Sequence, residues 1–227
     1  MALRKPSTTF EVRQSVPARS LAPDIGERAI FAGQTGSGKT TAMLKLLPAY
    51  YGRRQIVIAD TKNDPTIEKL AGPVATRLQD LPRIANKKVA DVPLVIYRPN
   101  AVELTDLLML DAFCEWIYRR KNTVLMVDEL GQFGAGAHAG PGLTSIFARG
   151  RTAEITVLAG TQRPVSVPII AFTESQLFFI FRLLFRRDRE RLSEYSHPDL
   201  IAPPTSPYGV KVYRTGDAEP VEYVSLT

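Results

Sequence analysis

The sequence has few of the features that mark secreted and membrane proteins. Its 227 residues include a single cysteine, Cys114, which cannot form an internal disulfide. We expect a buried core thiol there, because Cys114 lies in an apolar pattern of helical spacing. No stretch reaches the roughly 20 apolar residues of a membrane-spanning helix, and residues 1–15 lack the apolar segment of a secretory signal. We therefore expect neither a disulfide framework nor a membrane span.

The composition is that of an ordinary globular protein with a basic excess. Lys and Arg number 29 against 23 Asp and Glu, and the resulting net charge of +6 permits a polyanionic partner without requiring one. Apolar residues make up 44% of the chain, which is enough to form a hydrophobic core that needs no disulfide cross-links. We expect one domain over residues 1–227, with an N-terminal arm at 1–24, a core at 25–191 and a C-terminal hairpin at 205–227.

Short apolar runs alternate with helical patterns along the core. Most runs are apolar at nearly every position, which is typical of strands buried on both faces of a parallel sheet covered by helices. The tail at 209–226 alternates instead, around a GDAEP turn, and predicts an antiparallel hairpin. The glycine-rich residues 131–142 are expected to form a flexible loop. The predicted strands are 28–32, 55–59, 94–97, 123–127, 155–159 and 177–181, and the predicted helices are 40–51, 103–120 and 143–149. The fold class that follows is α/β, with a mainly parallel sheet.

A phosphate-binding motif lies between the first predicted strand and the first predicted helix. Residues 33–40, GQTGSGKT, fit the pattern G-x-x-x-x-G-K-[ST] in full. Glycines let backbone N–H groups point at phosphate oxygens, and the helix N-terminus adds its positive end. Lys39 supplies a charge to the β- and γ-phosphates, and the Thr40 hydroxyl is a ligand for Mg²⁺. The predicted nucleotide-binding residues are Gly33, Thr35, Gly36, Ser37, Gly38, Lys39, Thr40 and Thr41.

Two carboxylates close the buried strand at 123–127. Asp128 at its tip can hold a magnesium shell, and Glu129 can orient and deprotonate water for attack on the γ-phosphate. Consecutive strand residues point to opposite sides, so the chain must turn after Asp128 if both are to serve one site. Gly131 is close enough to allow that turn.

The stretch FARGRTAEITVLAGTQRP, residues 147–164, places cations before one core strand and polar residues after it. Gln162 ends that strand at the sheet edge where ligands bind, and can sense the γ-phosphate or position water. Arg149 and Arg151 are expected at the opposite edge of the sheet. There they would be too far from the nucleotide of their own subunit but within reach of the nucleotide of an adjacent subunit. This is the geometry of an arginine finger supplied in trans. The alternative is a pair of helix-end cations that complement the macrodipole.

Together these motifs resemble the FtsK–HerA superfamily of P-loop motor ATPases. The resemblance covers residues 28–191 and includes Asp60-Thr61-Lys62, which is similar to that superfamily's acidic, lysine-containing turn. The string at 149–164 is its specific part, because the phosphate loop is common to many proteins. The small size resembles the genome-packaging ATPases of tailless, membrane-containing icosahedral viruses of the tectivirus type. Longer DNA translocases of the superfamily carry extra DNA-reading or membrane domains, which have no counterpart in these 227 residues.

The resemblance implies a RecA-like core, a homo-hexameric ring and double-stranded DNA in its channel. It implies ATP and Mg²⁺ as ligands, capsid portal or vertex proteins as partners, and a place in the host cytoplasm and at the packaging vertex of the virion. The implied roles are nucleotide and metal binding for Lys39 and Thr40, a metal-shell acid for Asp128, and a catalytic base for Glu129. Gln162 is implied as sensor and either Arg149 or Arg151 as finger.

Two other functions stay open on the sequence. A P-loop kinase also uses paired arginines in its lid, but it needs no Asp-Glu pair followed by a strand ending in Thr-Gln. An assembly or export ATPase of the filamentous-phage type shares the motifs without acting on DNA. Such export proteins often carry a membrane span, which is not expected here.

Overall fold

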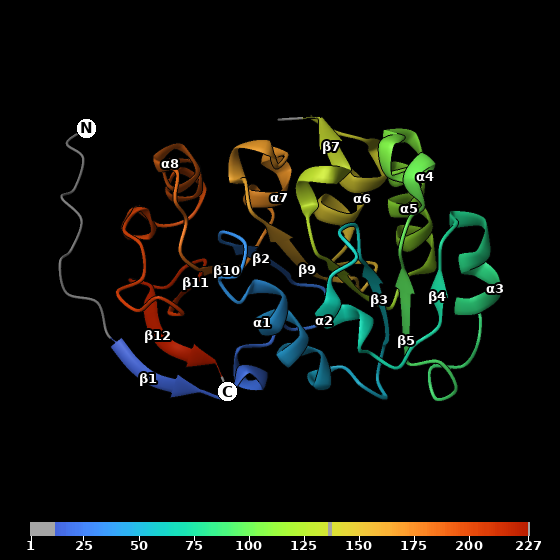
Figure 1. Cartoon of the computed structure of the whole chain (residues 1–227), viewed down its shortest axis with the longest axis horizontal. Coiled ribbons are helices and arrows are strands. Elements are labelled where there is room, and N and C mark those ends of the chain that lie inside the picture. Colours follow the sequence, from blue (N-terminus) through green and yellow to red (C-terminus); the bar gives the residue numbers. More distant parts are fainter. Residues whose placement is uncertain (1–11, 136–137, 227) are drawn as a thin grey trace.

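A ten-stranded sheet forms the centre of the molecule, in the order β1-β12-β11-β10-β2-β9-β6-β3-β5-β4. The computed structural model describes residues 12–135 and 138–226. Figure 1 shows β1 and β12 at one end of the sheet and β4, with α3 beside it, at the other. The strands are β1 Val12–Val16, β2 Arg28–Ala32, β3 Gln55–Ala59, β4 Val74–Ala75, β5 Leu94–Tyr97, β6 Thr123–Val127, β9 Thr156–Thr161, β10 Leu177–Ile180, β11 Val210–Arg214 and β12 Val221–Leu226.

Within this sheet β11 alone runs against the other strands, so the fold is mainly parallel with an antiparallel hairpin at its C-terminal end. The predicted fold class is confirmed. The helices are α1 Lys39–Leu46, α2 Pro65–Glu68, α3 Leu81–Ala85, α4 Ala101–Thr105, α5 Leu107–Arg120, α6 Pro141–Arg149, α7 Ile169–Thr173 and α8 Arg186–Tyr195.

Helices cover both faces of the sheet and make two separate cores. Alternate residues of β2 show the division, since Ile30 and Ala32 belong to one core while Ala29 and Phe31 belong to the other. Side chains of α3, α5, α6, α7 and α8 complete the first core, and side chains of α1 and α2 complete the second. Because β2, β3, β5, β6 and β9 are buried at every position, they contain apolar runs rather than alternating patterns. Cys114 is buried in the first core, as expected.

The order of the central strands places the site. Strand β9 lies between β2, which leads into the phosphate loop, and β6, which leads into Asp128 and Glu129. All three strands are parallel, so their carboxyl ends meet at one edge of the sheet, where ligands bind in open α/β sheets.

The structure corrects two details of the predicted elements. The helix predicted at 103–120 is divided at Asp106, whose side chain accepts a hydrogen bond from the Leu108 N–H and caps a new helix, α5. The glycine-rich residues 131–142, expected as a loop, include most of a 3₁₀ turn, Leu130–Phe133, then a two-stranded ribbon, β7 Gly134–Ala135 with β8 His138–Ala139, and the start of α6. Gly134 is needed in that ribbon, because a Cβ there would lie 2.6 Å from the Pro168 side chain.

No helix among residues 12–135 and 138–226 is long and apolar enough to span a bilayer.

Candidate functional site

The phosphate loop turns between the end of β2 and the start of α1. Gly36 and Gly38 have φ values of 74° and 98°, in the left-handed region that glycine adopts without steric cost. Gly33 is required for a different reason, because a Cβ there would lie 2.6 Å from both Ser37 Oγ and the Phe181 Cβ. The glycines therefore permit a backbone path that curls around the N-terminus of α1, where unpaired N–H groups favour anions.

Lys39 lies in the first turn of α1 with its ammonium group held by the loop itself. Its Nζ donates to the carbonyl oxygens of Gly33, at 2.6 Å, and Gln34, at 2.8 Å. The residue is 7% exposed. The pKa of Lys39 is lowered to about 8, mainly by burial and also by the nearby charge of Lys62, while Glu129 and Asp64 oppose the shift. Part of the electrostatic cost of this buried ammonium would be relieved by a phosphate.

Asp128 follows β6 and is fixed by the turn after β3. Its Oδ1 accepts from the Thr61 backbone N–H at 3.0 Å and from the Thr61 hydroxyl at 2.7 Å, and its Oδ2 accepts from the Lys62 N–H at 3.0 Å. Burial raises the pKa of Asp128 to about 6, with a smaller contribution from Asp60, although the bonds from Thr61 favour the charged form. The carboxylate is thus rigidly placed at the cavity, in surroundings that favour its pairing with a cation.

The chain turns directly after Asp128, which lets Glu129 face the same edge of the sheet. A 3₁₀ turn begins at Leu130, and a Cβ on Gly131 would lie 3.4 Å from Glu129 Oε1. Glu129 Oε2 accepts from Lys62 Nζ at 2.5 Å and from the Gln162 backbone N–H at 3.1 Å. Both acids are therefore held by neighbouring strand ends.

The end of β9 connects the phosphate loop to these acids. The Thr161 carbonyl accepts from the Gly33 N–H at 3.1 Å, while the next residue, Gln162, donates its N–H to Glu129. Gly160 allows this close approach, since a Cβ there would lie 2.5 Å from the carbonyl oxygen of Asp128. The strand between β2 and β6 thus fixes how far the phosphate loop lies from Glu129.

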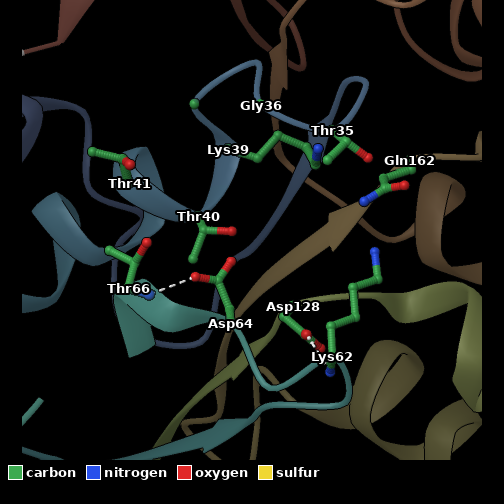
Figure 2. Close-up of a pocket in the computed structure, with 11 residues that line it drawn as sticks. Thr35, Gly36, Lys39, Thr40, Thr41, Lys62, Asp64, Thr66, Asp128 and Gln162 are labelled. Atoms are coloured by element: carbon green, nitrogen blue, oxygen red, sulfur yellow. Dashed lines mark hydrogen bonds between the residues drawn. The ribbon is translucent and has the colours of Figure 1, made fainter. Parts of the chain in front are cut away.

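A cavity of about 210 Å³ lies where these elements meet (Figure 2). Eight of the predicted site residues line it, namely Thr35, Gly36, Gly38, Lys39, Thr40, Thr41, Asp128 and Gln162. Three further residues complete the lining, Lys62 and Asp64 of the turn after β3 and Thr66 of α2. Figure 2 shows the Lys62 side chain extending across the cavity toward Gln162, and Asp64 beside Thr40. In the sequence, these three residues could have been found from the run of mostly polar residues, 60–66, that directly follows the strand predicted at 55–59.

The structure does not bring Arg149 and Arg151 to this cavity. Both precede the first residue of β9, so they lie at the opposite edge of the sheet from the phosphate loop. Arg149 is exposed, donates to Ser145 Oγ at 2.6 Å and stacks over the Tyr118 ring at 5.0 Å. Arg151 is exposed as well and lies against Gly26. Within one chain, neither arginine lines the phosphate cavity.

A second cavity, of about 340 Å³, adjoins the phosphate loop on the side of the C-terminal hairpin. It shares Gly36, Gly38 and Thr41 with the first cavity. Phe181, Tyr208 and Leu226 form an apolar wall, and Lys45 beside them donates to the Leu226 carbonyl at 2.6 Å. The two cavities together offer a polar half and an apolar half on either side of one loop.

No family model matches the chain. In sequence it is 27% identical over 184 residues to the DNA packaging ATPase P9 of Enterobacteria phage PRD1, a match that spans 78% of this chain and 74% of P9. In structure it matches the genome packaging NTPase B204 of Sulfolobus turreted icosahedral virus 2 with a TM-score of 0.67 and 15% identity, over 90% of this chain and 98% of B204. The chain resembles viral genome-packaging ATPases. The resemblance predicted from the motifs is confirmed.

The same fold occurs in larger ATPases. The pCW3 conjugation coupling protein TcpA aligns with a TM-score of 0.56 and 13% identity, over 89% of this chain and 60% of TcpA. The cytoplasmic domain of the type VII secretion ATPase EccC from Thermomonospora curvata aligns with a TM-score of 0.54 and 14% identity, over 88% of this chain and 25% of that domain. The chain therefore shares its fold with part of each of these proteins.

Proposed function

We propose that this protein is an ATPase that packages a viral double-stranded DNA genome. The observation that carries the proposal is the convergence of Lys39, Asp128 and Gln162 on one cavity at the carboxyl edge of a parallel sheet, with Glu129 hydrogen-bonded to the Gln162 N–H beside it. Only such a convergence allows a phosphate, a metal and an attacking water to be held together. The similarity to P9 and B204, whose names state DNA packaging and genome packaging, supports the choice of DNA packaging among motor functions.

In the proposed reaction the oxygen of a water attacks the γ-phosphorus of ATP. Glu129 takes the water proton, the bond from the γ-phosphorus to the β–γ bridging oxygen breaks, and ADP leaves with the bond's electron pair. Lys39 neutralises charge on the β- and γ-phosphates. Gln162, whose N–H holds Glu129, is placed to report the state of the γ-phosphate to the end of β9.

The residues at the cavity fit a magnesium ion. Mg²⁺ in nucleotide sites is commonly held by one or two carboxylates together with phosphates and waters. Asp128 and the Thr40 hydroxyl line the same cavity, with Asp64 beside Thr40. The raised pKa of Asp128, at about 6, follows from burial that a cation would offset. When bound, the ion neutralises charge on the β- and γ-phosphates. Asp128 and Thr40 would hold it.

The second cavity suits the nucleoside part of the ligand. Structures of B204 have been solved with AMPPCP and with ATP-γ-S, and in this chain the apolar cavity begins where the phosphate loop ends. Tyr208, which is 72% exposed at the cavity wall, offers a ring on which a base can stack. Replacing Tyr208 by Ala should weaken binding of ATP and ADP equally, because both share the nucleoside.

A ring places Arg149 or Arg151 of one subunit at the nucleotide of the next. Their position at the opposite sheet edge, away from their own cavity, supports a role in trans. In this proposal the ring is a homo-hexamer with the DNA duplex in its channel. Portal or vertex proteins of the capsid are its partners, and it acts in the infected host cell and at the packaging vertex of the virion.

The test measures phosphate release from ATP with and without duplex DNA at low salt, together with the mass of the assembly with and without nucleotide. Hydrolysis should rise when duplex DNA is added. Lys39→Ala should weaken nucleotide binding by about 10- to 100-fold, because a charged hydrogen-bond donor is lost. Glu129→Gln should still bind nucleotide and lower the rate of hydrolysis by at least about 100-fold, because it keeps the shape of the side chain and loses the base.

Two outcomes would redirect the proposal. Hydrolysis in Glu129→Gln at the wild-type rate would show that the base is assigned wrongly. If duplex DNA does not change the rate of ATP hydrolysis in assembled rings, the proposal of DNA packaging would be refuted. An export ATPase would then be favoured, and the same fold occurs in the secretion ATPase EccC.

A further inference from the structure

Lys62 contacts both acids of the site with different parts of the residue. Its backbone N–H donates to Asp128 at 3.0 Å, and its side-chain ammonium donates to Glu129 Oε2 at 2.5 Å. The Lys62 side chain is 35% exposed whereas that of Glu129 is 9% exposed, so the ion pair opens toward the cavity from the lysine side. Lys62 lies on the turn after β3, which is a different element from either the phosphate loop or the strand that leads into Glu129.

In this arrangement Glu129 is not ready to act as a base. Its Oε2 accepts from the Lys62 ammonium and from the Gln162 N–H, and that N–H also lies 3.3 Å from Oε1. A general base must offer a lone pair to the water that it deprotonates. A carboxylate oxygen already engaged by a cation offers that lone pair less well, so the ion pair restrains hydrolysis.

The same ammonium is within the cavity that receives the phosphates. Lys62 and Lys39 both line it, and the charge of Lys62 contributes to the lowered pKa of Lys39. Figure 2 shows the Lys62 side chain extending from beside Asp128 toward Gln162. A terminal γ-phosphate is a dianion with three acceptor oxygens, and it competes for an ammonium more strongly than one carboxylate does. The diphosphate of ADP ends one phosphate earlier and lacks that competitor.

We propose that Lys62 is a γ-phosphate sensor that releases the catalytic base. With ADP or without nucleotide, Lys62 pairs with Glu129 and holds it inactive. With ATP, the ammonium moves to the γ-phosphate, and Oε2 of Glu129 becomes free for water. The Gln162 N–H keeps Glu129 in place during the exchange. The inference rests on the proposed ATPase function and adds a device that confines hydrolysis to the triphosphate-bound state.

The first test compares the affinities of AMPPCP and ADP, both with Mg²⁺, in wild type and in Lys62→Met. The variant should lose about tenfold in AMPPCP affinity, because a charged hydrogen-bond donor to the γ-phosphate is removed, while its ADP affinity stays within about twofold. Lys69→Met is the matched control, since Lys69 is an exposed lysine seven positions along the same segment. Should Lys62→Met fold poorly, Lys62→Gln keeps most of the length and lacks the charge, and it should show the same selective loss.

A double-mutant cycle with Glu129→Gln separates the switch from simple repulsion. Glu129→Gln frees the ammonium, so it should tighten AMPPCP binding several-fold in the wild-type background and not in Lys62→Met. Equal tightening in both backgrounds would show that Glu129 merely repels the phosphate, and would overturn the switch.

The two proposals fail in distinguishable ways. Equal loss of AMPPCP and ADP affinity in Lys62→Met, or no loss at all, would refute the sensor while wild-type hydrolysis of ATP still stood. A wild-type protein that neither binds nor hydrolyses ATP would refute both.

Discussion

The buried ammonium of Lys39 makes nucleotide affinity depend on pH in a range where most lysines are unaffected. Burial lowers its pKa to about 8, so the charged form is present below that pH and is lost as the pH rises through it. The protonated fraction falls from about nine tenths at pH 7 to about one tenth at pH 9. If only charged Lys39 binds phosphate, the Kd of ADP should rise about tenfold over this interval, which corresponds to about 1.4 kcal/mol.

The assay is a titration with a fluorescent ADP analogue at constant Mg²⁺ and ionic strength between pH 7 and 9. Lys39→Arg is the control, because arginine stays charged throughout, so any trend left in that variant belongs to the nucleotide and to other groups. Calorimetry at pH 8 in buffers of different ionisation enthalpy should also detect uptake of about half a proton on binding, since bound phosphate raises the pKa of Lys39 again. A Kd that does not rise with pH relative to Lys39→Arg would refute the reasoning.

Other predictions follow from the remaining contacts. Gly160→Ala should lower the free energy of unfolding by about 1–3 kcal/mol, because its Cβ would lie 2.5 Å from the Asp128 carbonyl oxygen; an unchanged urea midpoint would contradict that close packing. Arg149→Ala or Arg151→Ala subunits should bind nucleotide but hydrolyse it slowly, and mixing them with Glu129→Gln subunits should restore some activity, because one interface then carries an intact base and an intact finger. Mixed rings that form without any recovery would contradict a role in trans. DNA affinity should be independent of base sequence and should fall with salt, with log K dropping by about 0.9 per neutralised phosphate for each unit of log salt; binding that salt leaves unchanged would speak against phosphate contacts.

Local apolar runs in the sequence were sufficient to predict most strands of the core. The predicted runs at 28–32, 55–59, 94–97 and 123–127 coincide with β2, β3, β5 and β6, because a strand covered on both faces must be apolar at nearly every position. The hairpin strands β11 and β12 also lie within the predicted tail. In contrast, the short strands β1 and β4 had no apolar run to reveal them, since they lie at the ends of the sheet and are largely exposed or very short.

Helix boundaries depended on single capping interactions that periodicity does not report. The apolar spacing at 103–120 continues across Asp106, yet the side chain of that residue caps a second helix and divides the segment. The charged helix α8 was missed because its pattern is dominated by arginine and acidic residues, and Leu192 is its one fully buried apolar position. A helix that packs against the core through one narrow apolar stripe has a high mean polarity, so its sequence shows little helical periodicity of apolar residues.

The sequence by itself determined the chemical groups of the site and the elements that present them. The spacing of glycines and Lys39 in residues 33–40, and the acids directly after an apolar strand, are local patterns whose physical reasons act within a few residues. Only the tertiary structure decided which of these groups meet. The insertion of β9 between β2 and β6 brings Gln162 to Glu129, and the neighbouring β3 brings Lys62 to the same carboxylate. Strand order is set by the packing of the whole sheet, so no local pattern shows which strand ends are neighbours.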